Sequence, residues 1–387
     1  EEEESCLKET LSNWMTIPNL RFKIMYIKNL KIKNFRNYDD ADIEFSPKTN
    51  ILCGNNGQGK TNIIEALYYL QSGKSFRCRK DRETIMFGKK NALIEIDFVI
   101  KGNDEKVQFY LSDKKSIKLN GIPIERLSEL VGIFNMVIFT PDHLNLIKDG
   151  PGIRRSFIDS LISQLKPSYL MTLINYYHVL KVRNAALKST KADLKSNISI
   201  WDMNLADYGT EIFKMRNSVI KKINGVINNI NYDNEIFERE KIKLKYIPAI
   251  RGDFEDKKIF LKQLSMNIEK DREKGMTLTG PHRDDFEIFM NGIDMKKYGS
   301  QGQIRSCVLK LKLSECEIIK EKVGEEPVLL LDDVLSELDK NRRKFFLDKL
   351  KKRQIIITCT DNENIEDKES IVYEIENAQI KKVKLEW

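Results

Sequence analysis

Residues 51–61 read ILCGNNGQGKT, an apolar run that breaks into glycine and asparagine and ends in lysine and threonine. Gly54, Gly59, Lys60 and Thr61 satisfy the pattern GxxxxGK[ST]. Its glycines let backbone N–H groups turn toward phosphate oxygens, its lysine adds positive charge, and its hydroxyl can ligate magnesium. A strand-like run precedes the motif and helical spacing follows it, so we expect a loop that binds a nucleoside triphosphate. The predicted loop comprises Gly54, Asn55, Asn56, Gly57, Gln58, Gly59, Lys60 and Thr61.

A second motif, PVLLLDDVLSELD, occupies residues 327–339. Its apolar part, Val328–Leu331, is typical of a buried strand, and the strand ends in Asp332 and Asp333. A carboxylate at the end of a core strand can reach a magnesium ion at the phosphate loop, and the next one can face an attacking water. The sequence SELD, beginning at Ser336, follows after a short gap.

A third motif, SQGQ, lies shortly before this strand. Ser300, Gly302 and Gln303 open a predicted helix whose apolar face runs through Ile304 and Val308. In isolation these residues are only a capping serine and a loop. Their position just upstream of PVLLLDD makes them candidates for a second part of the nucleotide site.

The order of patterns along the chain predicts an α/β fold with an inserted helical arm. Residues 26–139 contain short apolar runs bounded by turn residues, which predict strands. From about residue 153 two long stretches have helical periodicity, and short strands and helices return from 277. We divide the chain into an N-terminal extension (1–24), a first ATPase lobe (25–150), a helical arm (151–250) and a segment that completes the ATPase lobe (251–387).

Composition narrows the class of protein further. A chain of 387 residues with 41% apolar content is long enough for two or three domains. The six cysteines form no CxxC pair and the three histidines lie far apart, which argues against a zinc cluster or a disulfide framework. We find no long uncharged apolar stretch and no signal peptide, so we expect no membrane segment and a cytoplasmic location. A net charge of +8 favours a polyanionic partner, or only a soluble surface.

Taken together, SQGQ and LLLDDVLSELD resemble the signature and Walker B motifs of ATP-binding-cassette ATPases. With YIKNLKIKNFRNY, GNNGQGKT, GPGIRRSFID and TLTGPHRDDF in this order, the chain resembles the RecF family of bacterial recombination mediators, relatives of the SMC ATPases. The resemblance implies ATP, Mg2+ and a homodimer that ATP induces. It also implies binding of gapped DNA, single-stranded DNA or junctions between single and double strands, in replication, repair and the SOS response. The partners it implies are RecR, RecO and, indirectly, RecA.

The resemblance also implies roles for the residues that would hold the nucleotide. Arg36 in NFRN would approach the phosphates, and Gly54–Thr61 would form the Walker A loop. Ser300, Gly302 and Gln303 would contact the nucleotide that the opposite subunit holds. Two ATP molecules would then be sandwiched between two heads.

Further residues would act on the metal, on water and on the coupling of the two sites. Thr61 and Asp332 would hold magnesium, and Asp333 would position or activate water. Ser336–Asp339 would form the D-loop, with Asp339 close to the nucleotide. The residues expected to act in catalysis are Lys60, Ser300 and Asp333.

Several positions depart from the wider superfamily. That superfamily has glutamate where Asp333 stands and a switch histidine near Thr360, so we expect a slow ATPase switch. Asp142 stands where relatives carry a Q-loop glutamine, and a role in magnesium binding follows only from that position. The alternatives are a transporter ATPase subunit, another SMC-type chromosomal ATPase, and a small-molecule kinase. A transporter subunit would have the glutamate, the histidine and a shorter insertion, and a kinase would explain neither SQGQ nor SELD.

Three further features have open interpretations. Lys74–Lys90 carries seven basic and two acidic residues, so it is either a contact for the DNA backbone or a solvated face. Arg154 and Arg155 could hold the arm on the head. GPHRDD at 280–285 we interpret as a turn with a packed ion pair, or as a subunit contact.

Overall fold

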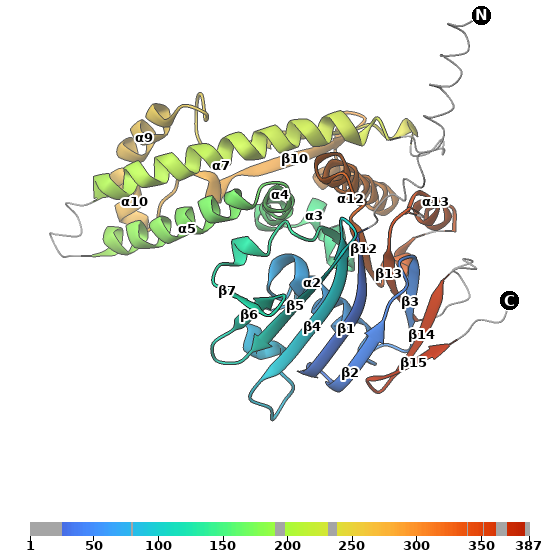
Figure 1. Ribbon diagram of the computed structural model, residues 1–387. Helices are drawn as coiled ribbons and strands as arrows, with labels where there is room; N and C mark the ends of the chain where they lie inside the picture. The colour runs from blue at the N-terminus through green and yellow to red at the C-terminus, as the bar shows by residue number, and fades with distance from the viewer. Residues whose placement is uncertain are drawn as a thin grey trace, which may run out of the picture.

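The structure is a computed structural model that describes residues 25–78, 80–189, 198–230, 238–338, 340–350, 352–360 and 370–383. Two sheets form the base of a head, helices cover it, and a long helical arm crosses above (Figure 1). This mixed α/β architecture is the fold class that the sequence predicted. Among the described helices, none has the combined length and apolarity that a membrane span needs.

The central sheet of the head has the strand order β15-β14-β3-β13-β12-β8. Its inner strands pair in parallel and consist of apolar runs, because both faces of the sheet are covered. β3 and β8, which precede the arm, pair with β12, β13 and β14, which follow it, so this sheet rejoins the parts of the head that the insertion separates. Its strands are β3 (Thr49–Cys53), β8 (Met136–Phe139), β12 (Val328–Asp332), β13 (Ile355–Cys359), β14 (Ile371–Glu376) and β15 (Gln379–Val383).

A second, antiparallel sheet has the order β2-β1-β4-β5-β6-β7. Buried and exposed residues alternate along β1, β4 and β5, as expected for a sheet with one face on the core. Helix α2 (Lys60–Ser72) lies between the two sheets and shares one hydrophobic core with both. The strands are β1 (Tyr26–Phe35), β2 (Tyr38–Glu44), β4 (Ala92–Ile100), β5 (Asn103–Leu111), β6 (Ser116–Leu119) and β7 (Ile122–Ile124).

Helices cover the other face of the central sheet and continue into the arm. In the arm, α5 and α7 lie side by side (Figure 1). One continuous core joins these helices, α4 and α12 to the central sheet. The helices are α3 (Asn145–Lys148), α4 (Pro151–Leu165), α5 (Pro167–Lys188), α7 (Ile198–Ile227), α12 (Gln301–Val323) and α13 (Lys340–Leu350).

The arm also contains a small sheet of order β11-β10-β9. β9 (Ile242–Ile247) pairs along its whole length with β10 (Asp285–Met290), so the boundary drawn at residue 250 falls between two paired strands. Helix α9 (Lys257–Met266), which follows that boundary in the sequence, packs on α7, which precedes it. The remaining elements are α10 (Ile268–Lys274), β11 (Ile293–Asp294), α11 (Met295–Tyr298) and the short 3-10 helices η1 (Asp81–Thr84), η2 (Leu127–Glu129), η3 (Pro141–Leu144), η4 (Pro281–Arg283) and η5 (Leu335–Glu337).

Buried ion pairs hold the GPHRDD segment against the arm and the head. Asp285 accepts hydrogen bonds from the buried Arg154 at the start of α4, the shorter being 2.6 Å. Asp284 pairs at 3.0 Å with Arg216 of α7, which also pairs at 2.8 Å with Asp159 of α4. The interpretation of this segment as a turn with a packed ion pair is confirmed, and so is the structural role of Arg154.

Candidate nucleotide-binding site

The glycine-rich loop runs from the end of β3 to the start of α2. Gly54 and Gly59 have φ values of 152° and 118°, which side chains rarely adopt. A Cβ on Gly54 would lie 2.2 Å from the Ile375 carbonyl oxygen, and one on Gly59 would lie 2.8 Å from the Tyr38 hydroxyl. The neighbouring strands therefore leave room only for glycine at both positions.

The rest of the loop is held from two sides. The ammonium group of the buried Lys60 donates to the carbonyl oxygens of Gly54 (2.5 Å) and Asn55 (2.9 Å), so its charge lies along the loop. The Gln58 side chain accepts a hydrogen bond of 2.5 Å from the Asn377 N–H. Asn55, Asn56 and Gly57 are exposed at the tip of the loop.

The Walker A and Walker B residues meet at the carboxyl ends of β3 and β12, which lie on either side of β13 in the central sheet. The Thr61 hydroxyl donates to Oδ1 of Asp332 at 2.9 Å, and the Thr358 hydroxyl donates to the same oxygen at 2.9 Å. Burial raises the pKa of Asp332, and these two hydrogen bonds oppose that shift. A hydroxyl beside a carboxylate is an oxygen pair that suits Mg2+, so these two residues fit the predicted metal site.

Asp333, the next residue, leaves the strand in a left-handed conformation with φ of 53°. Its N–H donates to the Thr358 hydroxyl at 2.8 Å, which fixes the turn at the end of β12. Its carbonyl oxygen accepts from the Ser336 hydroxyl. Asp339 lies outside the described residues.

The signature residues lie at the exposed start of α12. Ser300 caps this helix: its hydroxyl accepts from the Gln303 N–H at 3.3 Å, and its own N–H donates to the Gln303 side chain at 3.0 Å. Gly302 belongs to the first turn. Among the described residues, no hydrogen bond joins Ser300 or Gln303 to the phosphate loop of the same chain.

Arg36 is bound to a carboxylate on the Walker A helix. Its guanidinium donates to both oxygens of the fully buried Glu65 at 2.9 and 2.6 Å, and to the Glu83 carbonyl oxygen at 2.8 Å. Ser75 and Arg77 also contact Glu65, the Arg77 pair at 3.5 Å. The guanidinium is therefore engaged by Glu65 in this arrangement, and the approach of Arg36 to the phosphates stays a prediction.

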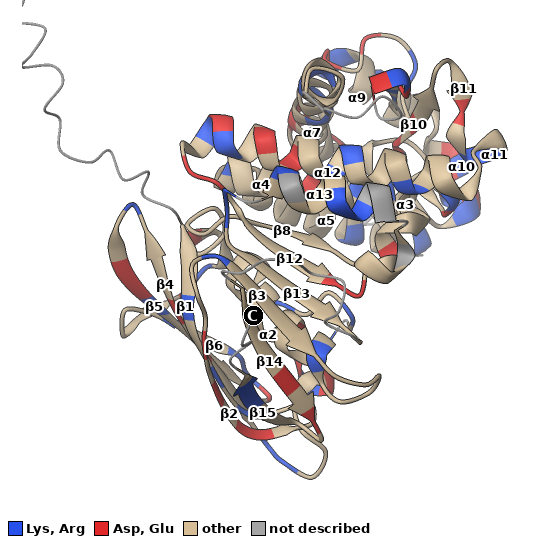
Figure 2. Cartoon of the chain, turned by 90° about the vertical axis from the view of Figure 1, so that its right-hand side faces the viewer, with Lys and Arg blue, Asp and Glu red and all other residues tan. Residues whose placement is uncertain are grey.

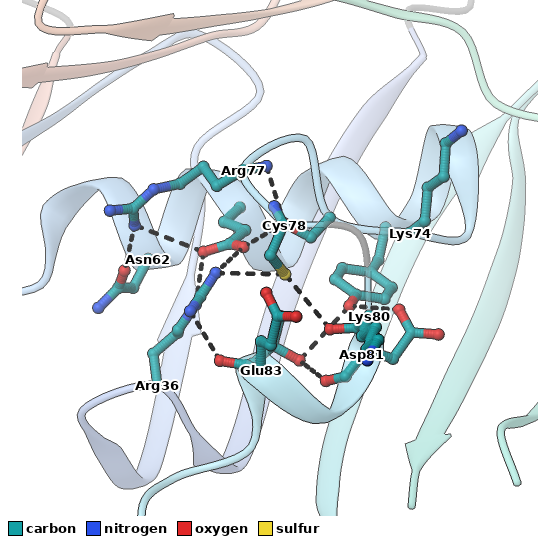
Figure 3. A network of polar contacts seen from close by, with 12 residues as sticks. Arg36, Asn62, Lys74, Arg77, Cys78, Lys80, Asp81 and Glu83 are labelled. Atoms are coloured by element: carbon teal, nitrogen blue, oxygen red, sulfur yellow. Dashed lines mark hydrogen bonds and ion pairs between the residues drawn. The ribbon is translucent and has the colours of Figure 1, made fainter. Parts of the chain in front are cut away.

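A second set of contacts forms a ring around the start of α2; its Asn62–Arg77 contact is drawn in Figure 3. Asn62 donates to the Asn37 side chain at 2.8 Å and accepts from Arg77 at 2.8 Å. Asn37 also donates to the Gln58 carbonyl oxygen at 3.2 Å, so the turn after β1 touches the phosphate loop directly. Sequence reasoning missed Glu65, Asn37 and Asn62. Only Glu65 left a signal, as the one acidic residue within the apolar stretch at 63–70 of this helix.

The other candidate residues follow strands of the central sheet or belong to the basic segment, and the Thr360 carbonyl oxygen accepts a hydrogen bond from the Cys53 thiol at 3.7 Å. Asp142 lies exposed in η3, and Thr360 lies exposed just past β13. Within Lys74–Lys90, Arg77 belongs to the ring described above, Arg82 pairs with Asp113, and Lys89 pairs with Asp39. The basic segment therefore contains both internal contacts and exposed cations.

A Walker A loop joined to a Walker B carboxylate, with a capped signature helix on the same head, defines an ATPase head of the ATP-binding-cassette type. The family described as RecF/RecN/SMC N terminal domain matches residues 26–382. The "DNA replication and repair protein RecF" of Clostridium botulinum (strain Okra / Type B1) is 44% identical over 93% of this chain and 100% of its own length. The protein of the same name from Clostridium perfringens (strain SM101 / Type A) is 43% identical over 92% of this chain and 99% of its own length.

Solved structures agree with these relatives. A structure of the recombination mediator protein RecF with ATP in the RecFOR pathway matches with a TM-score of 0.86 and 34% identity, covering 95% of this chain and 100% of that one. An SMC head bound to a winged-helix domain of ScpA matches with a TM-score of 0.53 and 18% identity, which shows a shared fold. The chain therefore belongs to the RecF/RecN/SMC family of ATPase heads and, within it, to the RecF proteins.

Proposed function

We propose that this protein is an ATP-dependent DNA-binding recombination mediator, in which ATP joins two heads across composite nucleotide sites. One observation carries the proposal: the Thr61–Asp332 pair and the Ser300 cap are both formed, but no hydrogen bond among the described residues links them. The cap is exposed at a helix start, where backbone N–H groups favour an anion. A second copy of the head can therefore present Ser300 to the nucleotide that the first copy binds.

The residues around Thr61 and Asp332 support Mg2+ as the metal of this site. The Thr61 hydroxyl and the Asp332 carboxylate would hold it, together with phosphate oxygens, as is usual for nucleotide-bound magnesium. The ion would neutralise charge on the phosphates. Lys60 would supply a further positive charge, and Asp333, the residue after Asp332, would orient the attacking water.

Slow hydrolysis fits the residues at the end of β12. Asp333 has a shorter side chain than the glutamate of the wider superfamily, and Thr360 offers no imidazole for proton transfer. A site that binds ATP well and cleaves it slowly suits a switch whose dimeric state persists on DNA.

Family membership supports the substrate and the partners. We propose gapped DNA, single-stranded DNA or junctions between single and double strands as the ligand, and RecR, RecO and, indirectly, RecA as the partners, in the cytoplasm. Lys and Arg are frequent on the helices of the upper layer (Figure 2), which offers a surface for a polyanion.

The test is the molecular mass of the protein in solution. We expect a monomer without nucleotide and a dimer with ATP, Mg2+ and a gapped duplex. A matched reaction with ADP should remain monomeric. A mass that ATP and DNA leave unchanged would contradict the composite-site proposal.

A further inference from the structure

Phe87 projects entirely into solvent, with a relative exposure of 102%. It lies in the loop between η1 and β4. The two residues before it are anchored to the end of β1: Ile85 forms a β-bridge with Phe35, and the Met86 N–H donates to the Asn34 carbonyl oxygen at 2.8 Å. The root of the loop is therefore held in place while the ring itself contributes nothing to the core.

Lysines lie on both sides of Phe87 in the sequence, at positions 80, 89 and 90. The side chains of Lys80 and Lys90 form no ion pair with other described residues, and both are exposed. Lys89 pairs with Asp39 at 3.1 Å, with side chains 46% and 73% exposed. Such exposed pairs contribute little free energy, so a phosphate can replace the carboxylate.

The root of the loop is connected to the nucleotide site. The Arg36 N–H donates to the Thr84 carbonyl oxygen at 2.7 Å, and the Arg36 guanidinium donates to that of Glu83 at 2.8 Å. The next residue, Asn37, donates to Gln58 of the phosphate loop. Phe87 is thus carried by a segment that is joined to the nucleotide-binding loop through the turn at Arg36 and Asn37; the Arg36–Glu83 contact is drawn in Figure 3.

We propose that Phe87 stacks on unpaired DNA bases while neighbouring lysines contact the phosphates of the same strand. This inference rests on the proposed DNA-binding function and adds how a single-stranded segment is distinguished from a duplex. Aromatic rings with nearby cations bind single strands without sequence preference, because every base has a face to stack on. In an intact duplex the bases are already stacked. A protein partner would favour further apolar surface around the ring, whereas Ile85 packs against the core and Met86 is partly buried.

A fluorescent variant tests the stacking directly. In Phe87→Trp, we expect a 20-nucleotide oligo(dT) strand, with ATP and Mg2+, to quench a large part of the added tryptophan emission, measured against the wild-type protein. A blunt duplex of the same length should quench less. The matched control is Ile122→Trp. Ile122 is 70% exposed on β7, the edge strand of the antiparallel sheet whose strand β1 anchors the Phe87 loop. Equal quenching in both variants would overturn the proposal.

Affinity and salt dependence separate stacking from charge. Phe87→Ala should weaken oligo(dT) binding by roughly five- to a hundredfold. It should not change the slope of the logarithm of the binding constant against the logarithm of the salt concentration. Lys90→Gln should instead reduce that slope by about 0.7. Unchanged affinity in Phe87→Ala, with normal DNA binding by the wild-type protein, overturns the stacking role alone. If the wild-type protein binds no DNA, the proposed function falls with it. If Phe87→Ala loses only dimerisation, the ring belongs to a protein contact and the proposal is wrong.

Discussion

The Thr61 hydroxyl donates a hydrogen bond of 2.9 Å to the Asp332 carboxylate across 271 positions of the sequence. The two residues follow β3 and end β12, and β13 lies between these strands in the central sheet. Carboxyl ends of parallel strands gather at one edge of a sheet, so Walker A and Walker B meet although the whole arm separates them in the chain. The following experiments test what this edge and its surroundings do.

Lys60→Ala should abolish tight ATP binding while leaving the fold intact. Among the described residues its ammonium group donates to the carbonyl oxygens of Gly54 and Asn55, so its loss removes positive charge from the loop. We expect ATP affinity to fall by roughly tenfold to a hundredfold or more, measured by calorimetry. Lys243→Ala, an exposed lysine of β9, is the control and should bind normally. Normal affinity in Lys60→Ala would refute the Walker A assignment.

Ser300→Arg should separate nucleotide binding from dimerisation. The Ser300 cap makes no hydrogen bond to its own phosphate loop among the described residues, so each monomer should bind ATP almost normally. A bulky cation there would block the opposite head, and sedimentation with ATP should show monomers. Mixing this variant with Lys60→Ala should restore some mixed dimer, because one composite site is then intact. Loss of ATP affinity in the isolated monomer would show that the composite site is wrong.

Neutralising Lys74, Lys80 and Lys90 together should weaken duplex DNA binding and lower its salt dependence by roughly 0.9 for each phosphate that is no longer neutralised. We choose these three lysines and leave Arg77 unchanged, because Arg77 contacts Glu65 and Asn62 and its loss would also disturb the nucleotide site. The measurement is affinity over a range of salt concentrations, with ATP binding as the control. An unchanged slope would leave the segment as a solvated face.

Acid should weaken the fold through His282. This side chain is fixed in a neutral form between the Tyr176 hydroxyl (2.7 Å) and the Thr277 carbonyl oxygen (2.9 Å). Burial lowers the pKa of His282 to about 4 from 6.5. As the pH falls, the histidine is protonated in the unfolded chain before it is protonated in the folded one. The stability that neutral His282 contributes is therefore complete above pH 6.5 and is lost as the pH falls toward 4.

A variant isolates this contribution. Burial raises the pKa of Asp284 to about 6, which acts in the opposite direction, so the wild-type profile mixes the two groups. The difference in unfolding free energy between the wild type and His282→Gln should shrink by about 1–3 kcal/mol between pH 7 and pH 4.5. Urea denaturation at both pH values measures it. A constant difference would contradict a neutral buried histidine.

Arg216→Met should destabilise the arm severely. Arg216 is nearly fully buried and pairs with Asp159 and Asp284, which the substitution leaves without their cation. We expect a loss of about 3–5 kcal/mol of unfolding free energy, measured with urea. The control, Arg272→Met, removes an exposed pair with Glu269 and should cost under about 1 kcal/mol. Comparable losses in the two variants would contradict the role of the buried pair.

The sequence alone was enough to predict the strand, loop and helix around Lys60, the strand that ends at Asp332, and the class of the fold. These features depend on consecutive residues, because apolar periodicity and the phosphate motif act over one or two elements. The α/β head with a helical arm is confirmed by the structure and by the family match.

Tertiary structure decided what depends on contacts between distant segments. Arg36 binds Glu65, and β9 pairs with β10 across the boundary drawn at residue 250. Phe87 projects into solvent from the basic segment, because Ile85 and Met86 anchor the root of its loop to β1. Sequence patterns show which side chains prefer burial, but the pairing of strands and the close packing around each side chain determine which of them find a partner.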